Sequence, residues 1–227
     1  MHFTHGLICL NWIEYGEKLL AMDPGNLQAL VTLPNVILTS LPTDATAKSA
    51  ALTKASDYAK KLLAVAKPAG IGDADWAGVQ AQARFTVGFG LFSKNAYAEA
   101  ITEFQEAIKL NKKDDQTHYN LGLAYNALLP DAQRLVLAGY DEENAAKTAL
   151  KPQAEIDAIV AKRAPLEADF RARRDLAIDA FARAAALAGP TSASARTQFE
   201  RLFKQKKADA TADEMNQYIA AKKAELG

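Results

Sequence analysis

Several residue types that mark particular protein classes are scarce in this sequence of 227 residues. Its one cysteine, Cys9, cannot form an internal disulfide bond, and its three histidines form no Cys/His cluster of zinc-binding spacing. The 12 glycines and 8 prolines are too few for a collagen or a disordered tail. These shortages exclude a disulfide scaffold and a fibrous protein, and they leave an ordinary globular one.

An excess of one charge is also lacking, because 27 Lys and Arg balance 27 Asp and Glu. We therefore expect no nucleic-acid partner and no attraction to an anionic membrane. No stretch approaches the roughly 20 apolar residues that cross a bilayer, so no membrane insertion is expected. The first ten residues have neither a basic leader nor a small-residue cleavage site, which predicts no signal peptide. The compartment stays open, since a cytoplasmic and an exported parent protein both fit.

Helix formers are abundant, and hydrophobic residues make up 49% of the chain. One helical stripe is clear where Ala100, Phe104 and Ala107 follow one another at spacings of four and three. Gly88 precedes this stripe, and Gly122 stands 34 positions further on in an equivalent place. A period of this length indicates a helical repeat.

The pattern resembles that of the tetratricopeptide repeat (TPR) family, in which W-x2-L-G-x2-Y is followed by A-x3-F, A and P. Val87, Gly88 and Leu91 stand for the L, G and Y of its first helix, called helix A, and the alanine stripe belongs to helix B. The Trp and Pro positions hold Arg84 and Lys112, which depart from the pattern. The resemblance implies an all-α fold, a right-handed superhelix of antiparallel helix hairpins (a TPR-like α-solenoid), with small residues where paired helices touch.

The repeat that follows, 115–191, is predicted to be split by a helical insertion. Gly122 lies in its helix A, but the A-x3-F motif of its helix B comes only at Ala177 and Phe181. About 43 residues more than in the first repeat separate the two helices, which places the insertion at about 131–174. We expect one or two extra helices there, projecting from one edge and continuing into helix B. A partner-contacting role and no role at all are both open for them.

The repeat register extends from the clear repeat at 81–114 to both ends of the chain. Downstream, 192–227 fits a degenerate capping repeat with a polar outer face. Upstream, 27–72 fits a divergent repeat in which Pro34 stands where the family prefers glycine, so we expect a kink there. Residues 1–26 fit only part of a repeat. The chain is therefore predicted to be a single TPR-like domain that begins partway through a repeat.

One segment has a local preference against this register. Residues 84–92 are rich in strand formers, and Gly88 and Gly90 each disfavour a helix by about 1 kcal/mol. Taken alone the segment would fit a strand, whereas the repeat register predicts a helix.

The candidate partner-binding residues lie on helix A, which lines the concave surface in the TPR family. Three phenylalanines recur there at i, i+4 and i+7, on one helix face. With the equivalent positions of the next repeat, the set is Phe85, Phe89, Phe92, Tyr119, Leu123 and Asn126. Such an apolar groove normally has a partner, although a neighbouring helix could instead cover the rings. The Lys and Asn clamp with which some family members bind acidic C-terminal peptides is absent, so an apolar peptide is expected.

Sequence motifs for catalysis are absent: we find no HExxH, GxSxG, phosphate-binding glycine loop or EF-hand series. His2 and His5 lie one helical turn apart but have no third ligand, so no metal site is expected. The sequence therefore predicts a protein that is not an enzyme and needs no cofactor.

The leading functional hypothesis is a non-catalytic protein–protein interaction scaffold that binds an apolar peptide or helix in its concave groove. The alternative is a structural assembly module. In that case the partial repeat at 1–26 would stack on a second copy or on the rest of a longer parent chain, and self-association through this half-repeat is possible. The identity of any partner is not encoded in a recognisable motif.

Overall fold

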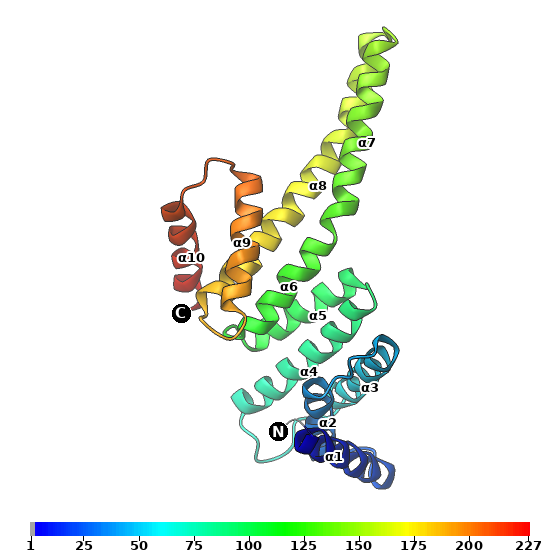
Figure 1. Cartoon of the computed structure of the whole chain (residues 1–227), viewed down its shortest axis with the longest axis vertical. Coiled ribbons are helices and arrows are strands. Elements are labelled where there is room, and N and C mark those ends of the chain that lie inside the picture. The colour runs from blue at the N-terminus through cyan, green and yellow to red at the C-terminus, as the bar shows by residue number, and fades with distance from the viewer. Residues whose placement is uncertain (1–2) are drawn as a thin grey trace. The chain divides into compact units, whose positions relative to one another are not determined.

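The computed structural model describes residues 3–227, and the side chains of residues 12–227. All regular structure in this part of the chain is α-helix, arranged as successive hairpins (Figure 1). The helices are α1 (Phe3–Met22), α2 (Leu27–Thr39), α3 (Ala45–Leu63), α4 (Asp73–Ser93), α5 (Tyr97–Leu110), α6 (Asp115–Ala127), α7 (Leu129–Thr148), α8 (Gln153–Ala186), α9 (Ser192–Lys206) and α10 (Ala212–Leu226). The predicted all-α fold of helix hairpins is confirmed. Because α4 includes residues 84–92, the strand alternative is wrong.

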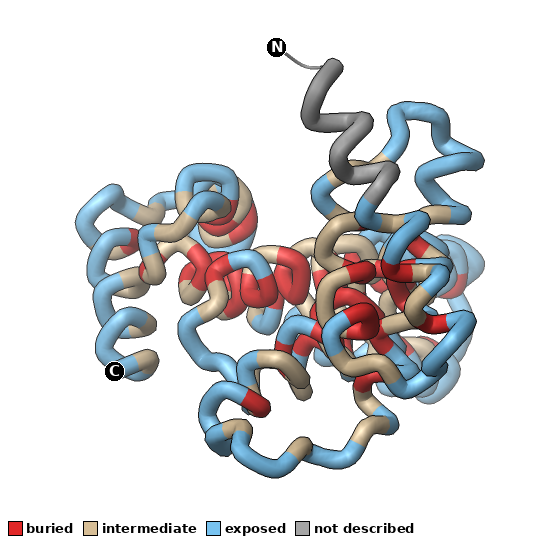
Figure 2. Tube along the Cα trace, turned by 90° about the horizontal axis from the view of Figure 1, so that it is seen from below, coloured by how far each residue is buried: buried red, intermediate tan, exposed pale blue. Residues whose placement is uncertain are grey.

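The chain divides into two compact units, of which the first ends at Asn120 and the second begins at Leu121. In the first unit each helix from α1 to α4 packs against the next one in sequence. Its core is built from apolar side chains of α1 to α4, among them Leu30, Leu62 and Trp76. Buried residues gather where neighbouring helices face one another (Figure 2). The single domain and the repeat boundaries expected from the sequence stay predictions.

Helix starts in the first unit are fixed by short polar side chains. The Asn26 side chain accepts a hydrogen bond from the Ala29 N–H at 3.0 Å, and Asp44 accepts one from Ala47 at 2.8 Å. Each bond satisfies a backbone donor that has no partner inside its helix. Pro34 lies inside α2, which continues to Thr39. The kink expected at this proline stays a prediction.

Helices α4 and α5 approach each other closely at Gly88. A Cβ atom added to Gly88 would lie 2.8 Å from the Phe104 ring, which is too close for a real contact. The Phe104 ring is completely buried, as are Ala100 and Ala107 on either side of it. Because glycine has only a hydrogen atom as its side chain, the Phe104 ring can pack directly against the backbone of α4 at Gly88.

The second unit contains the same contact between helices much further apart in sequence. A Cβ atom added to Gly122 on α6 would lie 2.7 Å from the Phe181 ring of α8. Phe181, Ala177 and Ala184 are completely buried. Gly122 thus has the same partner type as Gly88, although its phenylalanine follows 59 residues later rather than 16.

The extra residues extend both helices of this hairpin into a projecting pair, α7 and the part of α8 up to residue 174, which we call the arm (Figure 1). The α7 residues that face α8 recur at spacings of four and three, as in a coiled coil. They are Ala132, Val136, Gly139, Glu143 and Ala146. A similar close contact recurs further along the arm, where Gly139 of α7 packs against the side chain of Arg163 of α8 as Gly122 packs against Phe181. An insertion of about 43 residues is close to three heptads out and three back, so α8 returns with the correct face inward.

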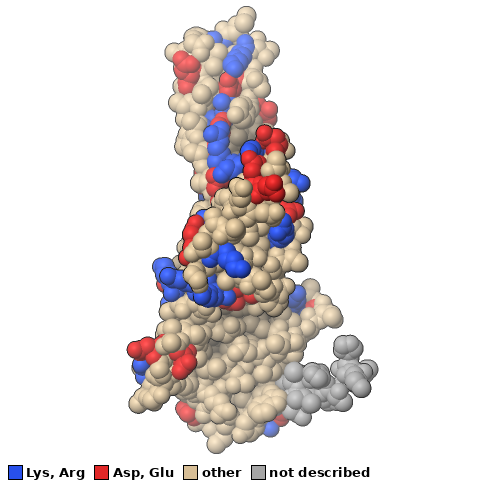
Figure 3. Space-filling model, turned by 90° about the vertical axis from the view of Figure 1, so that its left-hand side faces the viewer, with Lys and Arg blue, Asp and Glu red and all other residues tan. Residues whose placement is uncertain are grey.

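An ionic layer replaces apolar packing in the middle of the arm. Arg163 is buried there and pairs with Glu143, and its Nε atom donates to Glu167 at 2.8 Å. Its guanidinium also lies 3.7 Å from the centre of the Tyr140 ring. Hydrogen bonds from Lys147 and Arg163 lower the pKa of Glu143, and those from Tyr140 and Arg163 lower the pKa of Glu167. Outside this layer, charges of both signs are interspersed over the arm (Figure 3).

The second unit ends with the hairpin of α9 and α10, the two helices expected for a cap. The rings of Phe199, Phe203 and Tyr218 form a cluster with centres 5.2 to 5.6 Å apart. Thr211 and Glu214 form a reciprocal capping box at the start of α10.

Two glycines of α4 should respond oppositely to the same substitution. Gly88→Ala should lower the stability by about 1–3 kcal/mol, because the methyl group overlaps the Phe104 ring. Gly78→Ala should raise it by about 0.5–1 kcal/mol, since nothing lies within 4 Å and alanine favours a helix. Urea unfolding followed by circular dichroism measures both. Equal effects would contradict the close approach of α4 and α5.

Lowering the pH should reduce the stability of the packing between α7 and α8 in the arm. A folded-state pKa below the ordinary value of 4.5 means that the stabilisation by Glu143 and Glu167 is complete above that value. It is lost as the pH falls through the lowered pKa. Thermal melts between pH 7 and pH 2 should show this loss, and it should shrink in Glu143→Gln. Asp131→Asn, at an exposed ion pair with Arg134, is the control and should leave the pH dependence unchanged.

Candidate functional site

Of the three phenylalanines on α4, Phe85 is the one that is buried. Its side chain is only 4% exposed, and its ring lies 5.9 Å from that of Phe104 on α5. It also stacks on Phe89 at 5.9 Å with an interplanar angle of 10°. As a direct partner contact Phe85 is therefore corrected to a core residue that supports Phe89 from beneath. The sequence spacing could not show this, because α4 is apolar on more than one side.

The other two rings of this stripe remain half-buried. Phe89 lies above Phe85, and Phe92 contacts the ring of Tyr97 at a centre-to-centre distance of 5.4 Å. A half-buried ring held by a second ring is fixed in orientation and still presents apolar area. Phe89 and Phe92 are thus suited to contact a partner.

The three remaining candidates are also half-buried but belong to different units. Tyr119 lies in the first unit, whereas Leu123 and Asn126 lie in the second. The Asn126 side chain accepts a hydrogen bond from Arg201 of α9 at 2.9 Å. That Tyr119, Leu123 and Asn126 form one groove with Phe89 and Phe92 stays a prediction.

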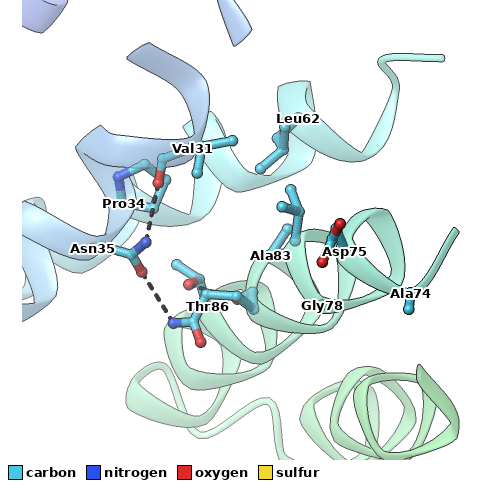
Figure 4. Close-up of a pocket in the computed structure, with 11 residues that line it drawn as sticks. Val31, Pro34, Asn35, Leu62, Ala74, Asp75, Gly78, Ala83 and Thr86 are labelled. Carbon is cyan, nitrogen blue, oxygen red and sulfur yellow. Dashed lines mark hydrogen bonds between the residues drawn. The ribbon is translucent and has the colours of Figure 1, made fainter. Parts of the chain in front are cut away.

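A pocket of about 410 Å³ opens between α2 and α4 in the first unit (Figure 4). Its apolar walls come from both helices and from one leucine of α3. The lining residues are Val31, Pro34, Asn35, Leu62, Ala74, Asp75, Gly78, Val79, Gln82, Ala83 and Thr86. Gln82 and Phe89 are seven residues apart on α4 and so lie on the same side of that helix. Phe89 therefore lies on the side of α4 that carries Gln82 of the pocket, two turns further along the helix.

Two amide side chains bridge the helices at this pocket. Gln82 Nε2 donates to Asn35 Oδ1 at 3.1 Å, and Asn35 Nδ2 donates to the Val31 carbonyl at 3.1 Å (Figure 4). The bridge lies beside Pro34, which itself has no N–H to donate. Each amide keeps further donor or acceptor capacity that an added main chain could use.

The sequence predicted neither Asn35 nor Gln82 as a site residue, although a signal existed. Pro34 stands in α2 where Gly88 stands in α4, so Asn35 has the register position of Phe89. Asn35 and Phe89 occupy equivalent positions, but Asn35 is polar and its repeat is divergent, so the aromatic pattern did not point to it.

The electrostatics of the pocket are simple. Asp75 is the only charged residue among those that line it. In the described part of the chain no three His, Cys, Asp or Glu side chains gather into a possible metal site. Nor does any helix there have the length and apolar character needed to cross a membrane. The arrangement can hold an apolar segment with a few hydrogen bonds.

Comparisons with known proteins agree with a helical repeat protein of the tetratricopeptide type. The family described as "TPR repeat" matches residues 90–128, which include the end of α4, α5 and α6. A solved structure described as "Crystal structure of MamA" superposes with a TM-score of 0.53 at 18% identity, covering 94% of this chain and 85% of that one. No curated protein matches the sequence. The resemblance to tetratricopeptide repeat proteins is thus confirmed, and it suggests a protein-interaction scaffold.

The assignment of Phe85 to the core and of Phe92 to the surface can be tested by truncation. Phe85→Ala should destabilise the first unit by about 3–5 kcal/mol, because it leaves a cavity beside Phe104. Phe92→Ala should cost about 1 kcal/mol or less, because its ring is already partly in water. Chemical unfolding of both variants gives the comparison, and a larger loss for Phe92→Ala would reverse the assignment.

Proposed function

We propose that this protein is a non-catalytic interaction scaffold whose first unit binds an apolar peptide or helix of a partner protein along α2 and α4. The observation that carries the proposal is the open pocket between these helices, with the Asn35–Gln82 bridge in its wall. Phe89 and Phe92 extend the binding face along α4 as aromatic anchors. Large, rigid aromatic side chains contribute most of the affinity at such interfaces.

The chemistry of the pocket defines the partner segment. Its apolar walls favour leucine-like or aromatic side chains, and the two amides can pair with an exposed main chain. Asp75 favours a basic residue at the rim. No lysine lines the pocket, so an acidic C-terminal tail is disfavoured.

Tyr119 in the first unit and Leu123 and Asn126 in the second are proposed as partner contacts of the unit to which each belongs. Binding, rather than catalysis, fits a site whose one ionisable side chain is a carboxylate at the rim.

Selection from a random peptide library displayed on phage tests this function with the full chain as bait. The selected peptides should be apolar with a basic residue, and their affinity can be measured by fluorescence anisotropy. Phe89→Ala should weaken binding about tenfold or more, because a central aromatic anchor is worth at least about 1.4 kcal/mol. Gln82→Ala should weaken it about threefold.

Leu137→Ala on α7 is the matched control, since Leu137 is an exposed apolar residue of the second unit. It should leave the affinity unchanged. Peptides that bind Phe89→Ala as tightly as the wild type, while that variant keeps its helicity, would place the binding site elsewhere.

A further inference from the structure

Helix α10 is attached to the second unit by less apolar packing than its neighbour α9. Met215 is the one buried residue of α10, whereas α9 buries Ala195, Phe199 and Leu202. The half-buried Tyr218 ring adds a stacked contact with Phe199, with centres 5.6 Å apart. A helix of 15 residues is only marginally stable by itself in water, so α10 depends on its contacts with the rest of the unit.

Four charged side chains supply a second attachment, which we call the α10 latch. Its members are Asp179 and Arg183 on α8 and Lys222 and Glu225 on α10. Lys222 Nζ lies 2.6 Å from Asp179 and 3.0 Å from Glu225. Arg183 Nε donates to Asp179 at 2.7 Å, and the same guanidinium pairs with Glu225. Each cation therefore contacts both carboxylates, and the four groups form a closed ring of charges.

The α10 latch lies partly out of water, which strengthens its ion pairs relative to those of an open surface. The Lys222 side chain is 16% exposed and that of Arg183 is 23% exposed. Burial acts to raise the pKa of Asp179, but hydrogen bonds from Arg183 and Lys222 outweigh it and lower that pKa. Burial acts to lower the pKa of Lys222, and its bonds to Asp179 and Glu225 outweigh that effect. Loss of one charge would leave its partners half-buried and poorly compensated.

The start of α10 is fixed mainly by contacts of its own residues. Thr211 and Glu214 form the capping box, and Glu214 also pairs with Lys207 in the connection before the helix. Arg196 of α9 donates to Asn216 at 2.6 Å, but both side chains are exposed, so water can replace this bond. The first turn of α10 can therefore stay formed while its packing on α8 and α9 is lost.

We propose that α10 is a strap that leaves α8 and α9 as a separate step when the α10 latch opens, while the rest of the second unit stays folded. Release uncovers the rings of Phe199 and Phe203, whose centres lie 5.2 Å apart on α9. Phe199 is completely buried in the closed form. The strap thus acts as an autoinhibitory cover over an aromatic surface, and this device is independent of the peptide site proposed for the first unit.

The labelling rate of a buried thiol by N-ethylmaleimide measures the release in the full chain. In a Cys9→Ser background, Met215→Cys places a thiol beneath the strap. Ala177→Cys is the matched control, because Ala177 is equally inaccessible but lies on the side of α8 that carries Phe181. Each rate is divided by the rate of the same chain unfolded in urea. The Met215→Cys chain should then react about tenfold faster or more, because the strap opens more often than the whole unit unfolds. Equal corrected rates would overturn the proposal.

Asp179→Asn tests the α10 latch itself, since this carboxylate contacts both cations. It should speed labelling of the Met215→Cys chain about fivefold or more and change that of the Ala177→Cys chain less than about twofold. Asp169→Asn is the control, because its pair with Arg173 lies within α8, and it should alter neither rate.

Amide hydrogen exchange followed by mass spectrometry gives the same test without added cysteines. The amides of α10 should exchange before those of α8 around Phe181, and Asp179→Asn should speed the exchange of α10 alone. An Asp179→Asn chain in which both segments exchange faster to the same extent, or in which neither changes, would show that the four charges do not act as a latch.

Discussion

The fold depends on one recurring contact, in which a phenylalanine ring of one helix rests directly on a glycine of its partner. Phe104 meets Gly88 in the first unit, and Phe181 meets Gly122 in the second. Small alanines on either side of each ring keep the helices close along the contact. The contact fixes which side of each helix is buried, and thereby which side is left for other molecules.

The arm shows how a repeat tolerates a long insertion without losing this contact. Added length in whole heptads leaves the helix phase unchanged, so Phe181 still points at Gly122. The buried Arg163 in the middle of the arm is stable only with both of its carboxylate partners, because an unpaired buried charge is strongly unfavourable. We infer that this ionic layer fixes the register of α7 against α8, because a shifted pairing of the two helices would separate Arg163 from Glu143.

The candidate site was only partly predictable from sequence. Spacing placed Phe85, Phe89 and Phe92 on one helix face, and Phe89 and Phe92 do retain exposed area. Phe85 lies on the edge of this face that packs against Phe104 of α5, and periodicity cannot tell a core ring from a surface ring. The Asn35–Gln82 bridge joins side chains 47 residues apart, and no local pattern specifies such a contact.

The sequence by itself determined the helical class, the 34-residue period and the pairing of Phe181 with a helix far upstream. These properties follow from spacing along the chain, which the geometry of the α-helix converts directly into faces. Tertiary structure alone decided which apolar faces are covered, as the contrast between buried Phe85 and exposed Trp12 shows. Coverage depends on the neighbours that a face meets in space, and a single helix period contains no information about them.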